Sequence, residues 1–256
     1  MALQGLGLTD FTGGATLDIG RVVEIGLKCM DLTLLDAEAT PEQLRNLARK
    51  GSEHGVAGVC VLPQHLDEVR TELPAGIELV AAAGLFPLPN PDLKERLEDI
   101  DFAVERDATE IDLVLDFESA KEGKVTEARL LLDKLVLACH DRRVKVIIES
   151  SVMDEAETRD ACRIAMSAGA AFVKSCTGTR GGCSELAARV IAEEALRYEK
   201  RTGIPVGIKL SGGISNLQNL ALLIDAVEDG FPGFKFDKDR FRIGASGLLE
   251  ELVRHR

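Results

Sequence analysis

The sequence predicts an α/β protein, a (β/α)8 TIM barrel with an extra N-terminal helix. Eight short apolar segments alternate with segments of helical period along the chain, which favours a barrel over a doubly wound sheet. The strand-like segments are apolar nearly throughout, as in a parallel sheet covered on both faces. The chain has 256 residues, a normal size for one such barrel. Since no linker or change of composition divides it, we expect one domain over residues 1–256.

Each element is predicted from its local pattern. Strands are read from apolar runs bounded by small residues, at 29–35, 57–62, 77–84, 109–115, 144–149, 171–176, 205–210 and 241–244. Helices are read from the 3.6-residue period, at 16–27, 41–54, 64–72, 91–106, 124–141, 155–168, 184–202, 215–228 and 246–254. Thr40 before Pro41, and Ser184 before an apolar-periodic run, are typical helix starts. Residues 229–240 are predicted to form a loop before the last strand.

The composition is that of an ordinary soluble globular protein with enough apolar residues for a large core. Hydrophobic residues make up 45% and charged residues 29%, and 31 Lys and Arg stand against 43 Asp and Glu, a net charge of −12. This balance argues against nucleic acid and anionic membranes as main partners. A small anionic ligand is still compatible, because a local site can be positive on a negative protein.

Cysteine and histidine patterns indicate neither disulfides nor a metal site. The six cysteines form no CxxC pair, and several lie in apolar segments, so we expect a reducing compartment. The four histidines have no ligand spacing, and we expect no metal or other cofactor. The N-terminus lacks the pattern of a signal peptide, and no apolar stretch is long enough to span a bilayer. A cytoplasmic location is therefore expected.

Two lysines interrupt the apolar strands. Lys174 lies in a segment that begins Ala-Ala-Phe-Val, and Lys209 lies in one that begins Pro-Val-Gly-Ile. A lysine is almost never fully buried unless another group pairs with it or uses it. These two occupy consecutive predicted strands, each just before a turn that contains glycine. This coincidence makes them the first candidates for function.

The barrel fold predicts that polar residues at the C-terminal ends of the strands meet at one mouth. The residues so placed are Asp31, Thr33, Asp112, Glu149, Lys174 and Lys209. Strands 6 and 7 are neighbours in such a barrel, so the two lysines are expected to lie close together. We expect Glu149 either to pair with a lysine or to help in catalysis.

These residue types suit imine (Schiff-base) chemistry. A lysine amine attacks a carbonyl only when unprotonated, and burial or a nearby cation can lower its pKa from ~10.4 toward ~7–8. One lysine can then be the nucleophile while the other supplies the positive field. Asp112 adds a carboxylate that can move protons. The alternative is a buried Lys–Asp ion pair without function, but a second lysine would leave its charge unbalanced.

Glycine-containing turns follow the same strands and suggest an anion site. They are Thr177-Gly178, Gly212-Gly213 and Gly244-Ala245-Ser246-Gly247. Small residues let backbone N–H groups approach a ligand, and the loops after strands 7 and 8 commonly bind phosphate in this fold. Arg180 is a further candidate for phosphate contact. The alternative is that its side chain is simply solvated on a loop. Cys176, on the same strand face as Lys174, is either a redox-sensitive thiol or a small packing residue.

Six segments together resemble deoxyribose-phosphate aldolase, in the order typical of that family. The most specific is Phe172-Val173-Lys174-Ser175-Cys176-Thr177-Gly178, and the others are 30–35, 108–114, 145–150, 207–213 and 242–246. The resemblance implies a metal-independent class I aldolase on a (β/α)8 barrel, which cleaves 2-deoxy-D-ribose 5-phosphate reversibly to D-glyceraldehyde 3-phosphate and acetaldehyde.

The resemblance also implies roles for individual residues. Lys174 would form the Schiff base, Lys209 would lower its pKa, and Asp112 would handle protons with a bound water. Asp31 would hydrogen-bond Lys209 or substrate hydroxyls. The phosphate would be held by Gly178, Gly212, Gly213 and Ser246, with Thr177 beside them.

The departures from the family pattern cluster on the phosphate side. Thr179 stands where the family commonly has a lysine, Ile214-Ser215 lacks the usual arginine, and one serine of a usual pair is replaced by Gly247. The sequence therefore also allows a related Schiff-base aldolase acting on another short sugar or sugar phosphate. A non-catalytic sugar-phosphate-binding barrel is a third possibility, although binding alone requires no pair of buried lysines. A homodimer or larger homo-oligomer is compatible with the sequence.

Overall fold

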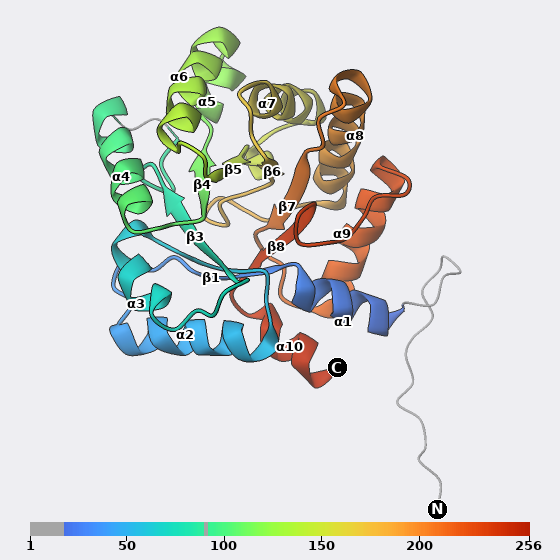
Figure 1. Ribbon diagram of the computed structural model, residues 1–256. Coiled ribbons are helices and arrows are strands. Elements are labelled where there is room, and N and C mark those ends of the chain that lie inside the picture. Colours follow the sequence, from blue (N-terminus) through green and yellow to red (C-terminus); the bar gives the residue numbers. More distant parts are fainter. Residues whose placement is uncertain (1–17, 90–91) are drawn as a thin grey trace, which may run out of the picture.

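A computed structural model describes residues 18–89 and 92–256, in which eight parallel strands form a closed barrel (Figure 1). Each strand pairs with the next, and β8 pairs with β1 to close the barrel. The strands are β1 (Met30–Leu34), β2 (Gly58–Val61), β3 (Glu78–Ala83), β4 (Glu110–Val114), β5 (Arg143–Ile147), β6 (Phe172–Lys174), β7 (Gly207–Ser211) and β8 (Phe241–Ala245). The predicted (β/α)8 fold is confirmed.

Helices surround this barrel, as Figure 1 shows. They are α1 (Ile19–Lys28), α2 (Pro41–His54), α3 (Leu66–Arg70), α4 (Leu93–Glu105), α5 (Phe117–Lys121), α6 (Val125–Ala138), α7 (Glu155–Ser167), α8 (Glu185–Thr202), α9 (Leu217–Gly230) and α10 (Leu248–Arg254), with short 3-10 turns η1 (Pro63–His65) and η2 (Ser150–Val152). Helix α1 precedes β1 and is the predicted extra N-terminal helix. The first two residues predicted for it, 16 and 17, lie outside the described residues, as does Pro91 at the predicted start of α4.

The sequence signals at helix starts act as expected. Thr40 caps α2 through a capping box with Gln43, and Pro41 is the first helical residue. Ser184 accepts a hydrogen bond from the backbone N–H of Ala187 at the start of α8. Helix α5 and turn η2 were not predicted, because five and three residues are too few to show a helical period.

The main hydrophobic core lies between the barrel and its helices. Outward-facing strand residues such as Leu32, Ile111 and Val146 belong to this core. Inside the barrel the apolar clusters are small, and one consists of Cys60, Val80 and Ala82. The interior therefore has room for the charged side chains of the other strands. Within the described residues, no helix combines the length and the apolarity needed to cross a membrane.

Phe172 fills the interior of the barrel beside Gly207. Its ring is fully buried, and a Cβ atom added at Gly207 would lie 2.3 Å from two ring carbons. Real Cβ atoms do not approach so closely, so β7 needs a glycine here to pair with β6. Gly207 lies two residues before Lys209. The packing of Phe172 against Gly207 therefore sets the distance between β6 and β7, the strands that carry Lys174 and Lys209.

We expect Gly207→Ala to lower the free energy of unfolding by about 1–3 kcal/mol, because the added methyl group overpacks the Phe172 ring. Urea denaturation of the purified protein measures this change through the transition midpoint. Gly20→Ala is the matched control, since Gly20 is exposed in α1 and its added Cβ would have only an ordinary contact at 3.5 Å. The control should be neutral or stabilising by up to ~1 kcal/mol, and equal effects of the two changes would contradict the packing argument.

Candidate active site

Seven charged side chains meet inside the barrel. They come from six strands and are Asp31 on β1, Glu110 and Asp112 on β4, Lys145 on β5, Lys174 on β6, Lys209 on β7 and Arg242 on β8. Lys174 is 2% exposed and the other six are 0% exposed. A cluster of buried charges of this size is stable only if the charges pair with one another.

Asp112 joins the two predicted lysines. Its Oδ2 atom accepts hydrogen bonds from Lys174 Nζ at 2.9 Å and from Lys209 Nζ at 2.7 Å. Lys209 also donates to Asp31 Oδ2 at 2.5 Å. The register of β6 and β7 pairs the two lysines directly, which explains why their side chains meet. The four catalytic residues proposed from the sequence are thus in one hydrogen-bonded chain.

Lys145, Glu110 and Arg242 continue this network and were missed in the sequence. Lys145 Nζ lies 2.5 Å from Glu110 Oε2 and 3.2 Å from Asp112 Oδ1. Arg242 contacts Glu110 Oε1 at 2.7 Å and Asp31 Oδ1 at 2.6 Å. Each interrupts an apolar strand, the same signal that identified Lys174. They were missed because each is the second residue of its predicted strand (109–115, 144–149 and 241–244), away from the C-terminal end at which site residues were expected.

The pairing determines which groups keep their charge. Burial alone would raise the pKa of Asp112, but Lys145, Lys174 and Lys209 outweigh burial and hold that pKa well below its usual value. Burial would lower the pKa of Lys209, yet the carboxylates of Asp112 and Asp31 raise it. The pKa of Lys145 is also raised against the effect of burial, chiefly by Asp112 and Glu110. Lys145 and Lys209 are therefore cations at neutral pH, and Asp112 is an anion.

A cavity of about 490 Å³ opens above this network at the C-terminal ends of the strands. Of the seven charged residues, only Lys174 lines it. The other lining residues come from the strand ends and the loops that follow: Thr33, Leu34, Leu35, Asp36, Phe86, Thr177, Gly178, Thr179, Ser211, Gly212, Gly213, Ile214, Ser215, Gly244, Ala245, Ser246 and Gly247. All the residues predicted for phosphate binding except Arg180 therefore face one cavity together with Lys174.

Two glycine-containing loops form one wall of this cavity. Gly178, Gly212 and Gly213 have φ values of 88°, 90° and 73°, in the left-handed region that favours glycine. The backbones of the loops are also in close contact, since a Cβ atom at Gly182 would lie 2.8 Å from the carbonyl oxygen of Gly212. Glycine at these positions lets backbone groups form the wall.

Glu149 supports the same wall, and its contacts differ from the expected pairing with a lysine. Its buried carboxylate accepts hydrogen bonds from Thr177 Oγ1 at 2.5 Å and from Ser151 Oγ at 3.0 Å. Its ion-pair partner is Arg180, at 3.5 Å, so the expected pairing with a lysine is wrong. Glu149 thus holds the loop after β6 in place.

Arg180 and Cys176 lie outside the cavity lining. The Arg180 guanidinium donates to the carbonyl oxygen of Pro87 and lies over the Phe117 ring. Cys176 is fully buried, with its Sγ 3.4 Å from Ser150 Oγ, which favours the packing interpretation of this thiol.

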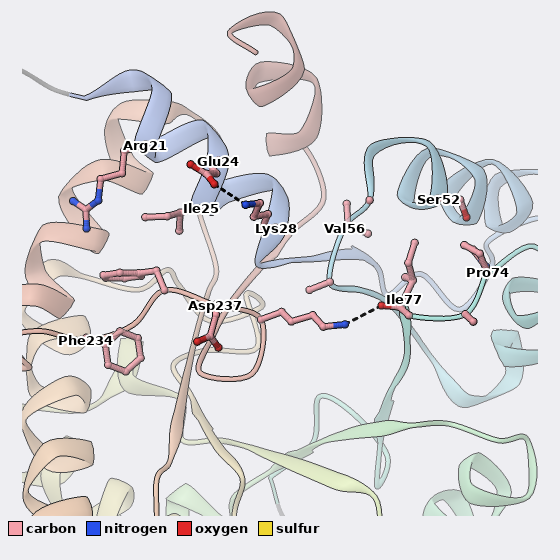
Figure 2. Close-up of a pocket in the computed structure, with 16 residues that line it drawn as sticks. Arg21, Glu24, Ile25, Lys28, Ser52, Val56, Pro74, Ile77, Phe234 and Asp237 are labelled. Carbon is pink, nitrogen blue, oxygen red and sulfur yellow. Dashed lines mark hydrogen bonds and ion pairs between the residues drawn. The ribbon is translucent and has the colours of Figure 1, made fainter.

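A second, larger cavity of about 860 Å³ lies at the N-terminal ends of the strands (Figure 2). It is lined by residues of α1 and of the segments that precede β2, β3 and β8, including Ile25, Val56, Ile77 and Phe234. Its charged groups are partly paired within the protein, as in Lys28 with Glu24. None of the seven interior charged residues lines this second cavity. The candidate active site is therefore the first cavity, at the C-terminal ends of the strands.

Comparison with known proteins shows similarity to aldolases. Residues 26–246 match the family model for DeoC/LacD family aldolases. The chain is 31% identical over 199 residues to a deoxyribose-phosphate aldolase of Staphylococcus carnosus, covering 78% of this chain and 88% of that protein. It is 34% identical over 200 residues to one of Kocuria rhizophila, covering 77% and 87%. All seven interior charges lie within the matched range.

A solved structure is similar over nearly the whole chain. It is the tetrameric deoxyribose phosphate aldolase of Aeropyrum pernix, with a TM-score of 0.73 and 26% identity, covering 91% of this chain and 92% of that one. The family match, the two relatives and this fold all place the chain among enzymes that are named as aldolases. The chain therefore belongs to the DeoC/LacD family of aldolases.

Proposed function

We propose that this aldolase is of class I and reversibly cleaves 2-deoxy-D-ribose 5-phosphate to D-glyceraldehyde 3-phosphate and acetaldehyde through an imine on Lys174. The observation that carries the proposal is the position of Lys174. Three buried lysines share the network, but only the Lys174 amine also lines the cavity. An aldehyde in the cavity can reach this amine alone.

The reaction follows from an amine in this position. The Lys174 amine adds to C1 of the open-chain sugar, and loss of water gives the imine. The C3 hydroxyl then loses its proton, the C2–C3 bond breaks, and its electron pair moves toward the imine nitrogen to give an enamine. D-Glyceraldehyde 3-phosphate leaves as the carbonyl product. Protonation of C2 and hydrolysis of the imine release acetaldehyde and restore the free amine.

The neighbouring residues have unequal roles in this proposal. Lys209 is the cation that favours the neutral form of Lys174, because like charges disfavour each other. Asp112 Oδ2 touches both amines and is therefore placed to pass a proton from one to the other. Asp31 contacts Lys209 and not the cavity, so its role is to hold Lys209 in place.

The phosphate would lie against the glycine-containing loops. Gly178, Gly212, Gly213 and Ser246 line the cavity and offer backbone N–H groups, with Thr177 beside them. Among the described lining residues, Lys174 is the one cation and Asp36 the one anion. This lack of a further cation supports a second candidate function, the same imine reaction on a sugar without phosphate. A homo-oligomeric state also stays a prediction.

Sodium borohydride with acetaldehyde should leave a two-carbon adduct on Lys174, because reduction converts the imine into a stable secondary amine. Peptide mass spectrometry of the treated protein locates the adduct. Lys174→Leu is the control and should remove it. An adduct on Lys209 or Lys145, or no adduct at all, would refute the proposed nucleophile.

We expect Lys209→Leu to move the pH–rate profile toward alkaline pH by about 1–3 units, because loss of the neighbouring cation stabilises protonated Lys174. Activity at neutral pH should fall about tenfold or more, since each unit below the pKa costs about tenfold in neutral amine. Steady-state rates of acetaldehyde release at several pH values measure the shift. An unchanged profile would exclude the coupling of the two lysines.

The two candidate substrates are separated by comparing cleavage of 2-deoxyribose with that of its 5-phosphate. If the loops hold the phosphate, kcat/KM should be larger for the phosphorylated sugar by about tenfold or more, and added inorganic phosphate should inhibit. Equal kcat/KM values would favour the sugar without phosphate. Binding of either sugar without turnover would instead support a non-catalytic barrel.

A further inference from the structure

We propose that Glu110, Lys145 and Arg242 are positioning residues that fix the protonation state of Lys174 through the charge balance of the barrel interior. This inference rests on the proposed imine at Lys174. None of the three lines the cavity, so none can touch the substrate there. They act through ion pairs: Lys145 pairs with Asp112 and Arg242 with Asp31, while Glu110 pairs with both of these cations.

The charges of the interior balance only if Lys174 is neutral. Asp31, Glu110 and Asp112 supply three negative charges. The cations Lys145, Lys209 and Arg242 supply three positive charges and pair with those carboxylates: Lys145 with Glu110 and Asp112, Lys209 with Asp31 and Asp112, and Arg242 with Asp31 and Glu110. A protonated Lys174 is a fourth cation without a carboxylate of its own.

The contacts identify Lys174 as the cation in excess. Lys145, Lys209 and Arg242 each contact at least two carboxylates within the network. Lys174 contacts one carboxylate within the described residues, Asp112, and only through the oxygen that Lys209 also uses. Deprotonating Lys145 or Lys209 would take a cation from at least two carboxylates, whereas deprotonating Lys174 takes one only from Asp112, which keeps Lys145 and Lys209.

Other groups that face the network do not alter this balance. From β2, Cys60 contributes a thiol whose pKa burial raises to about 11, so it is neutral. From β3 the packed residues are Val80 and Ala82. Glu149 at the end of β5 is matched by Arg180. Arg143, 3.5 Å from Glu110, has a side chain that is 35% exposed and pairs with Asp239 at 2.8 Å.

The balance predicts shifts of opposite sign for two single substitutions. Glu110→Gln removes a negative charge with little change of shape, so protonated Lys174 becomes less favourable and the amine becomes neutral at lower pH. Lys145→Met removes a positive charge, so three cations including Lys174 face three carboxylates and the amine stays protonated to higher pH. Each shift should be about 1 pH unit, because only Asp112 separates Lys145 from Lys174, and Glu110 is the next group along the same network.

The experiment measures imine formation as a function of pH. Wild type and variants are mixed with acetaldehyde, quenched with borohydride at short times, and the fraction of Lys174 adduct is determined by mass spectrometry. We expect the midpoint to move to lower pH in Glu110→Gln and to higher pH in Lys145→Met. The double variant Glu110→Gln/Lys145→Met restores the original balance and should return the midpoint close to that of wild type.

The outcomes distinguish this inference from the function on which it rests. No Lys174 adduct in wild type at any pH would refute the proposed function. A wild-type adduct with both single variants shifted in the same direction, or with neither shifted, would overturn the charge balance alone. A structural role would slow the reaction at every pH without moving the midpoint. If Lys145→Met does not fold, Arg242→Met takes its place with the same expected direction.

Discussion

The interaction on which the interior of this barrel depends is the sharing of one oxygen atom, Oδ2 of Asp112, by the amino groups of Lys174 and Lys209. Asp112 also pairs with Lys145, and one carboxylate cannot neutralise both Lys145 and Lys209, so the surrounding strands must supply more negative charge. Asp31 does this for Lys209, and Glu110 does it for Lys145 and Arg242. Removing any one partner would leave a buried charge without compensation, a loss that is usually large.

This arrangement is possible because the hydrophobic stabilisation is elsewhere. The main apolar core lies between the barrel and the helices, where the outward faces of the strands are buried. The strand residues that point into the barrel can then be polar or charged. Phe172 and Gly207 fill the interior below the two lysines, and the network above them ends at the cavity with Lys174. On the side away from the cavity, the charged side chains of the network are thus fully buried.

Most of the fold could be predicted from the sequence, because apolar runs and helical periods are local signals. The strand bounds differ by a few residues at most, and the elements that were missed, such as α5, are too short for a period. The site was predicted less completely. Lys174 and Lys209 were found because each lies toward the C-terminal end of its predicted strand, just before a glycine-containing turn, whereas Lys145 and Arg242 lie at the start of their predicted strands. The partners of Glu149 could not be predicted, since they depend on how the loop after β6 folds back across β5.

The close contact between the glycine loops has a consequence for how this enzyme can diverge. A side chain at Gly182 or Gly212 would force the two loops apart, so these positions resist change whatever the substrate. Thr179, Ile214 and Ser215 face the same cavity without that restriction, and they lie on loops rather than on the strands that carry the lysines. Natural selection or laboratory evolution can therefore alter the lining of the cavity at these three positions while the charged network below them is inherited unchanged.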